Sequence, residues 1–161
     1  MVIGAAAMAA YGYIRHTEDV DLAVNIAICD LASVADSLRT AGYVVAVREP
    51  DGQDPLGGVI DVSGSFGLVQ IVNFGERFPA IIDSGCAESA LRTHEGGSLR
   101  IAPLPHLIGL KLYAGGFKSQ ADIVELLRCN PAADRESIRT LCSLYRLRGL
   151  EPLIEEADRL S

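Results

Sequence analysis

The chain has 161 residues, of which 49% are hydrophobic and 22% charged, and its net charge is −7. This composition is typical of a compact globular chain and argues against disorder. The negative charge and the aromatic content of 6% argue against a broad non-specific surface for nucleic acids. No apolar run reaches the roughly 18 residues that span a bilayer, and the N-terminus lacks the charged segment of a signal peptide. We therefore expect a cytoplasmic protein with no membrane contact.

The first half of the predicted fold alternates helices and strands. An alanine-rich helix is expected over residues 5–11, ending at Gly12, and a strand over 20–28 follows it. Asp30 is a plausible N-cap for a helix that ends at Gly42. The remaining β elements are a strand at 43–47, a turn-rich segment at 49–58, and a hairpin formed by 59–62 and 68–74.

The second half is mainly helical. The pattern predicts a short helix over 79–86, a hairpin of 90–93 and 99–102, a helix opened by Pro105 and closed by Gly115 and Gly116, and then helices near 118–127, 134–147 and 150–159. The predicted fold class is α/β (α+β), with a mixed sheet. Residues 1–102 form the predicted core, and residues 103–161 a helical C-terminal segment packed on it.

The distribution of charge differs between the two parts. Acidic residues predominate over 1–61, whereas basic residues predominate over 111–148. A nucleotide or an RNA end between these parts would suit this arrangement. The alternative, which the charge pattern favours, is that the arginines belong to ordinary solvated helix faces. The cysteines lack metal-ligand or disulfide spacing and are expected to be small buried hydrophobes in a reducing compartment: Cys29, Cys86, Cys129 and Cys142.

The segment with the clearest chemistry is Asp19-Val20-Asp21. Its two carboxylates stand at i and i+2 of a predicted strand and therefore point to the same face. Like charges side by side disfavour joint ionisation unless a cation compensates them. Mg²⁺ takes one or two protein carboxylates together with phosphate oxygens. The alternative is a solvated strand edge without a metal.

The surrounding residues extend this pattern. A small-residue turn, Gly4-Ala5, opens the first helix, and Arg15-His16-Thr17-Glu18 leads into Asp19-Val20-Asp21-Leu22. Over about twenty residues this stretch resembles the nucleotidyltransferase superfamily, which includes DNA polymerase beta and small bacterial toxin or antitoxin nucleotidyltransferases. The C-terminal part also resembles the family in form, from Leu107-Ile108-Gly109-Leu110-Lys111-Leu112 to Asp122-Ile123.

The resemblance implies roles for individual residues. Asp19 and Asp21 would carry Mg²⁺ or Mn²⁺, while Gly4 and the amides that follow it would approach the triphosphate. Arg15 would contact phosphate or lock its loop, and Thr17 belongs to the same motif. Lys111 could approach the nucleotide or, as an alternative, extend from its helix to water.

Two positions depart from the family pattern. Gln70 stands where the resemblance implies a third catalytic aspartate, and a glutamine brings no negative charge and no general base. Asp61, on the partner strand of the hairpin, is the nearby acid that could substitute for it. Ala5 lacks the hydroxyl of the family's serine at that position.

The resemblance implies metal-dependent transfer of a nucleoside monophosphate from a nucleoside triphosphate to a hydroxyl on RNA or protein. Membership of a toxin–antitoxin pair with a cognate protein partner is a hypothesis by analogy. The alternative is a catalytically impaired nucleotidyltransferase fold that binds a nucleotide or a protein. If Asp61 lies close to Asp19 and Asp21, the enzyme is favoured. If Gln70 lies close to them and Asp61 points away, the binding module is favoured. A purely structural role, with Asp19 and Asp21 solvated, is the third possibility.

Overall fold

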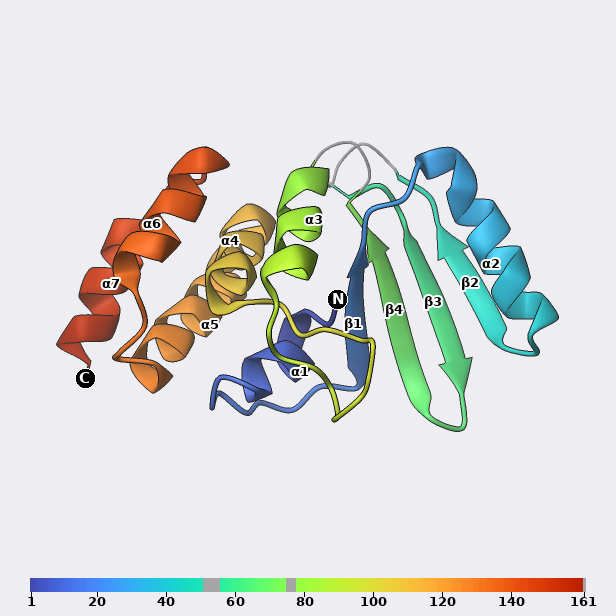
Figure 1. The fold of residues 1–161 in the computed structure, drawn as a ribbon, viewed down its shortest axis with the longest axis horizontal. Coiled ribbons are helices and arrows are strands. Elements are labelled where there is room, and N and C mark those ends of the chain that lie inside the picture. The colour runs from blue at the N-terminus through green and yellow to red at the C-terminus, as the bar shows by residue number, and fades with distance from the viewer. Residues whose placement is uncertain (51–55, 75–77, 161) are drawn as a thin grey trace.

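The computed structural model describes residues 1–50, 56–74 and 78–160, which form a four-stranded mixed sheet, seven α-helices and one short 3₁₀ helix (Figure 1). This confirms the predicted α+β class. The strands are β1 (Asp19–Val24), β2 (Val44–Arg48), β3 (Val59–Gly64) and β4 (Gly67–Asn73). The helices are α1 (Gly4–Ala9), η1 (Ile28–Asp30), α2 (Leu31–Thr40), α3 (Pro79–Glu88), α4 (Leu104–Ala114), α5 (Gly116–Cys129), α6 (Arg135–Leu144) and α7 (Leu150–Arg159).

The strand order β1-β4-β3-β2 places the hairpin in the middle of the sheet. β3 and β4 are antiparallel, and β1 joins β4 in parallel. The chain therefore leaves β1, crosses through α2, and returns as β2 at the opposite edge. Facing residues of neighbouring strands share a face of the sheet, so Asp21, Gln70 and Asp61 form one row across β1, β4 and β3.

The two faces of the sheet have separate cores. Ile60 and Val62 of β3 pack with Leu31 and Ala35 of α2, which covers one face. The alternating residue Val59 belongs instead to the larger cluster that α1, α3 and the C-terminal helices complete. The row that contains Asp21 lies on this second face, because it follows the same alternation.

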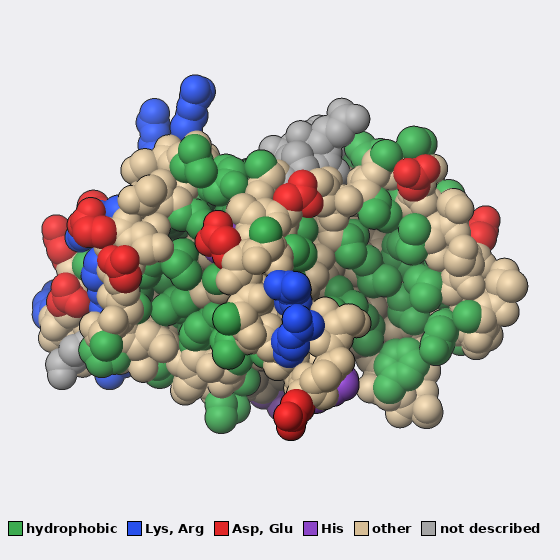
Figure 2. All heavy atoms as spheres, viewed as in Figure 1, with side chains coloured by type: hydrophobic (Ala, Val, Ile, Leu, Met, Phe, Trp, Pro, Cys, Tyr) green, Lys and Arg blue, Asp and Glu red, His purple; other side chains and the backbone are tan. Residues whose placement is uncertain are grey.

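The C-terminal helices continue the larger core. Buried residues of α4, α5, α6 and α7 belong to the same cluster as residues of α1 and β1. These helices lie beside α3, on the β1 side of the sheet, while α2 lies at the β2 side (Figure 1). On the face that Figure 2 shows, hydrophobic side chains gather over the sheet, and charged side chains gather on the left over α6 and α7. The boundary at residue 102 stays a prediction.

Several predicted elements differ in extent. β1 ends at Val24, and η1 begins at Ile28, the last residue of the predicted strand. Asp30 holds the N-cap position of α2, but its side chain makes no capping hydrogen bond. The expected hairpin of 90–102 is reduced to one bridge between Arg92 and Arg100, flanked by two backbone hydrogen bonds, and both arginine side chains donate to loop carbonyls. Residues 51–55 of the predicted turn segment lie outside the described residues.

None of the described helices is both long and apolar enough to cross a membrane.

Candidate functional site

The aspartate pair lies at the beginning of β1, as the alternation predicts. Asp19 faces Leu68 and Asp21 faces Gln70 on β4, so both aspartates belong to the face that carries the larger core. Thr17 Oγ1 donates to Asp19 Oδ1 over 2.5 Å, which fixes that carboxylate from the loop before the strand. The carboxylate of Asp21 is deeper, at the edge of a pocket.

Gly4 and Asp21 are in close apposition. Gly4 begins α1 with φ of +62°, a conformation that L side chains rarely adopt. A Cβ at this position would lie 1.9 Å from Asp21 Oδ2, a distance that no side chain permits. The backbone bond from Ile3 N to Asp21 O, 2.9 Å long, ties the turn to β1. The glycine is therefore required both by its backbone conformation and by the carboxylate that occupies the space of a side chain.

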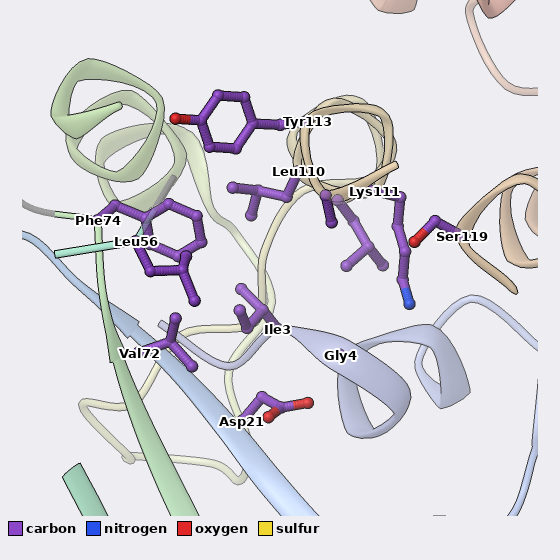
Figure 3. A pocket seen from close by; sticks show the side chains of 12 residues that line it. Ile3, Gly4, Asp21, Leu56, Val72, Phe74, Leu110, Lys111, Tyr113 and Ser119 are labelled. Atoms are coloured by element: carbon purple, nitrogen blue, oxygen red, sulfur yellow. The ribbon is translucent and has the colours of Figure 1, made fainter. Parts of the chain in front are cut away.

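A pocket of about 330 Å³ opens beside this contact. Figure 3 shows its two ends: Asp21, Gly4, Lys111 and Ser119 at one, and apolar side chains of β4 and α4 at the other. The amino group of Lys111 points from α4 toward Gly4 and α1. The apolar end is lined by Leu56, Val72, Phe74, Leu110 and Tyr113. Such a pocket suits a ligand with one charged end and one apolar, planar end.

Two cations near the pocket share one buried carboxylate. Asp122 of α5 is 2% exposed, and its Oδ2 accepts from Lys111 Nζ over 2.5 Å. Its Oδ1 lies 3.4 Å from Arg15 Nε, a buried donor without a hydrogen-bond partner in the described structure. Asp122 compensates one of these two positive charges, so the cluster keeps one positive charge next to the carboxylate of Asp21.

The electrostatics of Asp21 follow from these neighbours. Burial raises the pKa of Asp21, and the nearby charge of Asp19 raises it further. Lys111, Arg15 and Lys118 act in the opposite direction without cancelling the increase. Asp21 is thus a carboxyl group whose ionised form is disfavoured in the folded protein, and a cation bound there would relieve this penalty.

The hairpin contributes Gln70 and Asp61 to the row. Gln70 lies directly opposite Asp21, at the position where the resemblance implies a third carboxylate. Asp61 lies one strand further, where Gln70 Nε2 donates to its Oδ1 over 2.8 Å. Arg48 of β2 forms two hydrogen bonds to Asp61, 2.9 and 3.0 Å long. Asp61 therefore shares the face of the aspartate pair, but its partners are Arg48 and Gln70.

Of the residues predicted for nucleotide binding, the fold brings Gly4 and Lys111 to the pocket together with Asp21. Arg15 lies at the Asp122 side of the cluster, and Thr17 is bonded to Asp19. Ala5 is buried in the larger core, so only its backbone faces the turn.

Sequence reasoning gave Asp122 no role. Its signal is present in the sequence: Asp122 lies on the apolar face of α5, in helical register with Ile123, Leu126 and Leu127. An acid on a buried helix face requires a cation, and Lys111 on the preceding helix is a lysine amid apolar residues. In the fold, Lys111 and Asp122 pair with each other, which accounts for both charged residues among apolar neighbours.

Comparison with known proteins gives a structural match only. No protein-family model matches the chain, and no curated protein matches its sequence. A solution structure of the antibiotic-resistance factor ANT(2'')-Ia, an aminoglycoside nucleotidyltransferase, is similar in fold, with a TM-score of 0.54 and 16% sequence identity. The match covers 90% of this chain and 80% of that one. The chain thus has a nucleotidyltransferase-like fold.

Proposed function

We propose that the protein is a metal-dependent nucleotidyltransferase that moves a nucleoside monophosphate from a nucleoside triphosphate to a hydroxyl acceptor. The observation that carries this proposal is the apposition of Gly4 and Asp21 at the charged end of the pocket, beside Lys111. The fold likeness to a nucleotidyltransferase supports it. The pocket also suits a nucleotide, because its apolar end suits the base and its charged end suits the phosphates.

The side chains of the site fit Mg²⁺ or Mn²⁺. The donors are hard oxygen atoms from Asp19 and Asp21, and Gln70 adds an amide next to them. The described residues contain no group of three His, Cys, Asp or Glu that could hold a metal. Two carboxylates with phosphate oxygens and water are nevertheless a usual set for Mg²⁺. When bound, the cation would supply charge compensation for the carboxylates and the phosphates.

The residues of the pocket have separate tasks in this proposal. Gly4 leaves room for the carboxylate of Asp21 at the start of α1, and the first amides of α1, which lack intrahelical partners, would approach the phosphates. Lys111 neutralises phosphate charge, while Asp122 holds its amino group in place. Arg15 supports the same cluster, and Thr17 fixes Asp19.

In the proposed reaction the acceptor oxygen attacks the α-phosphorus of the triphosphate. The bond from that phosphorus to the α,β-bridging oxygen breaks, and pyrophosphate leaves with the bonding electrons. The acceptor hydroxyl releases its proton to solvent, because Gln70 cannot accept it. An acceptor on RNA or protein, a role in a toxin–antitoxin pair and a cytoplasmic location remain parts of the proposal.

A second candidate is a nucleotide-binding or protein-binding module without transferase activity. The position of Gln70 opposite Asp21 favours it, because a neutral side chain stands where the resemblance implies a catalytic carboxylate. The pairing of Asp61 with Arg48 favours it as well, since both carboxylate oxygens of Asp61 already accept hydrogen bonds from the arginine.

Two experiments separate these functions. In the first, nucleoside triphosphates are titrated by calorimetry with and without Mg²⁺ or Mn²⁺, using wild type, Asp21→Asn, and Asp36→Asn of exposed α2 as the matched control. In the second, α-³²P-labelled triphosphates are incubated with RNA and cell proteins. Metal-dependent binding that Asp21→Asn alone abolishes, together with label transfer, supports the enzyme. Such binding without transfer to any acceptor supports the module, and the absence of binding contradicts both.

A further inference from the structure

The hydrogen bond between Gln70 and Asp61 fixes the orientation of the Gln70 amide. An ionised carboxylate only accepts hydrogen bonds, so the amide group must present its NH₂ to Asp61. The 2.8 Å contact from Nε2 to Asp61 Oδ1 shows this arrangement. The carbonyl oxygen, Oε1, is consequently the atom turned away from Asp61. Among the described residues no donor hydrogen-bonds to Oε1.

Asp61 is itself fixed from the other side. Arg48 donates from Nε to Oδ2 and from Nη2 to Oδ1, a bidentate arrangement that sets the plane of the carboxylate. Oδ1 therefore receives hydrogen bonds from both Arg48 and Gln70. The chain of contacts runs across the sheet from β2 through β3 to β4, and its last member faces Asp21 on β1.

We propose that Asp61 and Arg48 position Gln70 so that its carbonyl oxygen serves as a neutral third protein ligand for the divalent cation that Asp19 and Asp21 would hold. This inference rests on the proposed function of that site. Asp61 is a positioning residue here, since it acts through Gln70. The charge of the donor set is then −2, where three carboxylates would give −3.

In this role, the carbonyl of Gln70 supplies the third oxygen donor of the row. An amide carbonyl is an accepted ligand of hard cations, and it needs its orientation fixed because the NH₂ end repels the ion. Partners that orient a ligand typically change metal affinity by about 10–100-fold when they are removed. Loss of the acceptor at residue 61 should therefore weaken the metal site although Asp61 does not touch the ion.

The test compares two substitutions that remove the same charge. Asp61→Asn keeps an oxygen where Oδ1 receives both hydrogen bonds, whereas Asp61→Ala removes it. Gln70→Leu removes the proposed ligand, and Ser63→Ala, an exposed residue on the same face of β3, is the control. Binding of Mg²⁺ and Mn²⁺ is measured by calorimetry, with and without a non-hydrolysable triphosphate. The NMR signal of the Gln70 side-chain amide is followed in the same titration, and circular dichroism checks the fold.

In wild type, Mg²⁺ is expected to shift the Gln70 side-chain amide signal. Gln70→Leu and Asp61→Ala should weaken metal binding by about 10-fold or more, and Asp61→Asn by less than about 3-fold. Equal losses in Asp61→Asn and Asp61→Ala would overturn the positioning role, because charge alone would then explain them. Unchanged binding in Gln70→Leu, or an unmoved amide signal, would overturn the ligand role while Asp21-dependent binding persists. If wild type binds no metal under any condition, the proposed function itself fails.

Discussion

Replacement of Gly4 by alanine tests the geometry of the site most simply. The substitution meets two obstacles: φ of +62° is strained for an L residue, and the new Cβ would lie 1.9 Å from Asp21 Oδ2. The backbone strain alone costs about 1–3 kcal/mol. The collision adds to this cost, because α1 or the Asp21 carboxylate must move. At about 2–4 °C per kcal/mol for a chain of this size, the strain alone lowers Tm by roughly 2–12 °C.

Gly42→Ala is the matched control. Gly42 follows α2 with φ of +94°, and a Cβ there meets nothing within 4 Å. It therefore carries a comparable backbone cost without the collision. Thermal unfolding and calorimetric binding of a nucleoside triphosphate with Mg²⁺ are measured for both variants. We expect Gly4→Ala to unfold at the lower temperature and to lose nucleotide binding, and Gly42→Ala to keep it. Equal Tm values and intact binding in both variants would refute the reasoning.

Three further predictions concern buried charges. Asp122→Asn leaves Lys111 without its buried counter-charge and should lower the free energy of unfolding by about 3 kcal/mol in urea titrations; a loss within error of zero would contradict the pairing. Asp21→Asn should raise Tm at pH 7 while it abolishes metal binding. The pKa of Asp21 is raised in the folded state, so its ionised form opposes folding, and a lower Tm in the variant would contradict this reasoning. Burial lowers the pKa of His106, whose Nε2 lies 2.9 Å from Ser84 Oγ and 3.9 Å from Glu88. The unfolded state then binds more protons, so the free energy of unfolding should fall as the pH drops below about 6.5, and His106→Gln should flatten this slope.

The sequence predicts the aspartate pair and its strand because both depend on local pattern. The alternation of Asp19, Val20 and Asp21 requires only that the segment be a strand, and the adjacent apolar run made that strand predictable. The same holds for α2, whose apolar face and final glycine are local features. The overestimated length of β1 has a physical cause: the apolar residues that follow Val24 favour a strand, but in the structure this segment is mostly exposed and η1 buries none of its residues.

The contacts across the site were harder to predict from the sequence, because they depend on the register between strands. The parallel pairing of β1 with β4 decides that Gln70 faces Asp21, and the hairpin register decides that Asp61 faces Gln70. A shift of either pairing by one residue would reverse the faces. The role of Arg48 depends on the same register and on the position of β2 at the sheet edge. Asp122 stands out locally as an acid on an apolar helix face, but its pairing with Lys111 depends on the packing of α5 against α4, which no local pattern specifies.

The central claim is that a nucleoside triphosphate and a divalent cation bind in the pocket between Gly4, Asp21 and Lys111. The most direct measurement is amide chemical-shift mapping by NMR during a titration with a non-hydrolysable triphosphate, with and without Mg²⁺. We expect metal-dependent shifts that centre on Gly4, Asp21, Lys111 and Ser119. Shifts that are absent, independent of the metal, or centred elsewhere on the protein would contradict the claim.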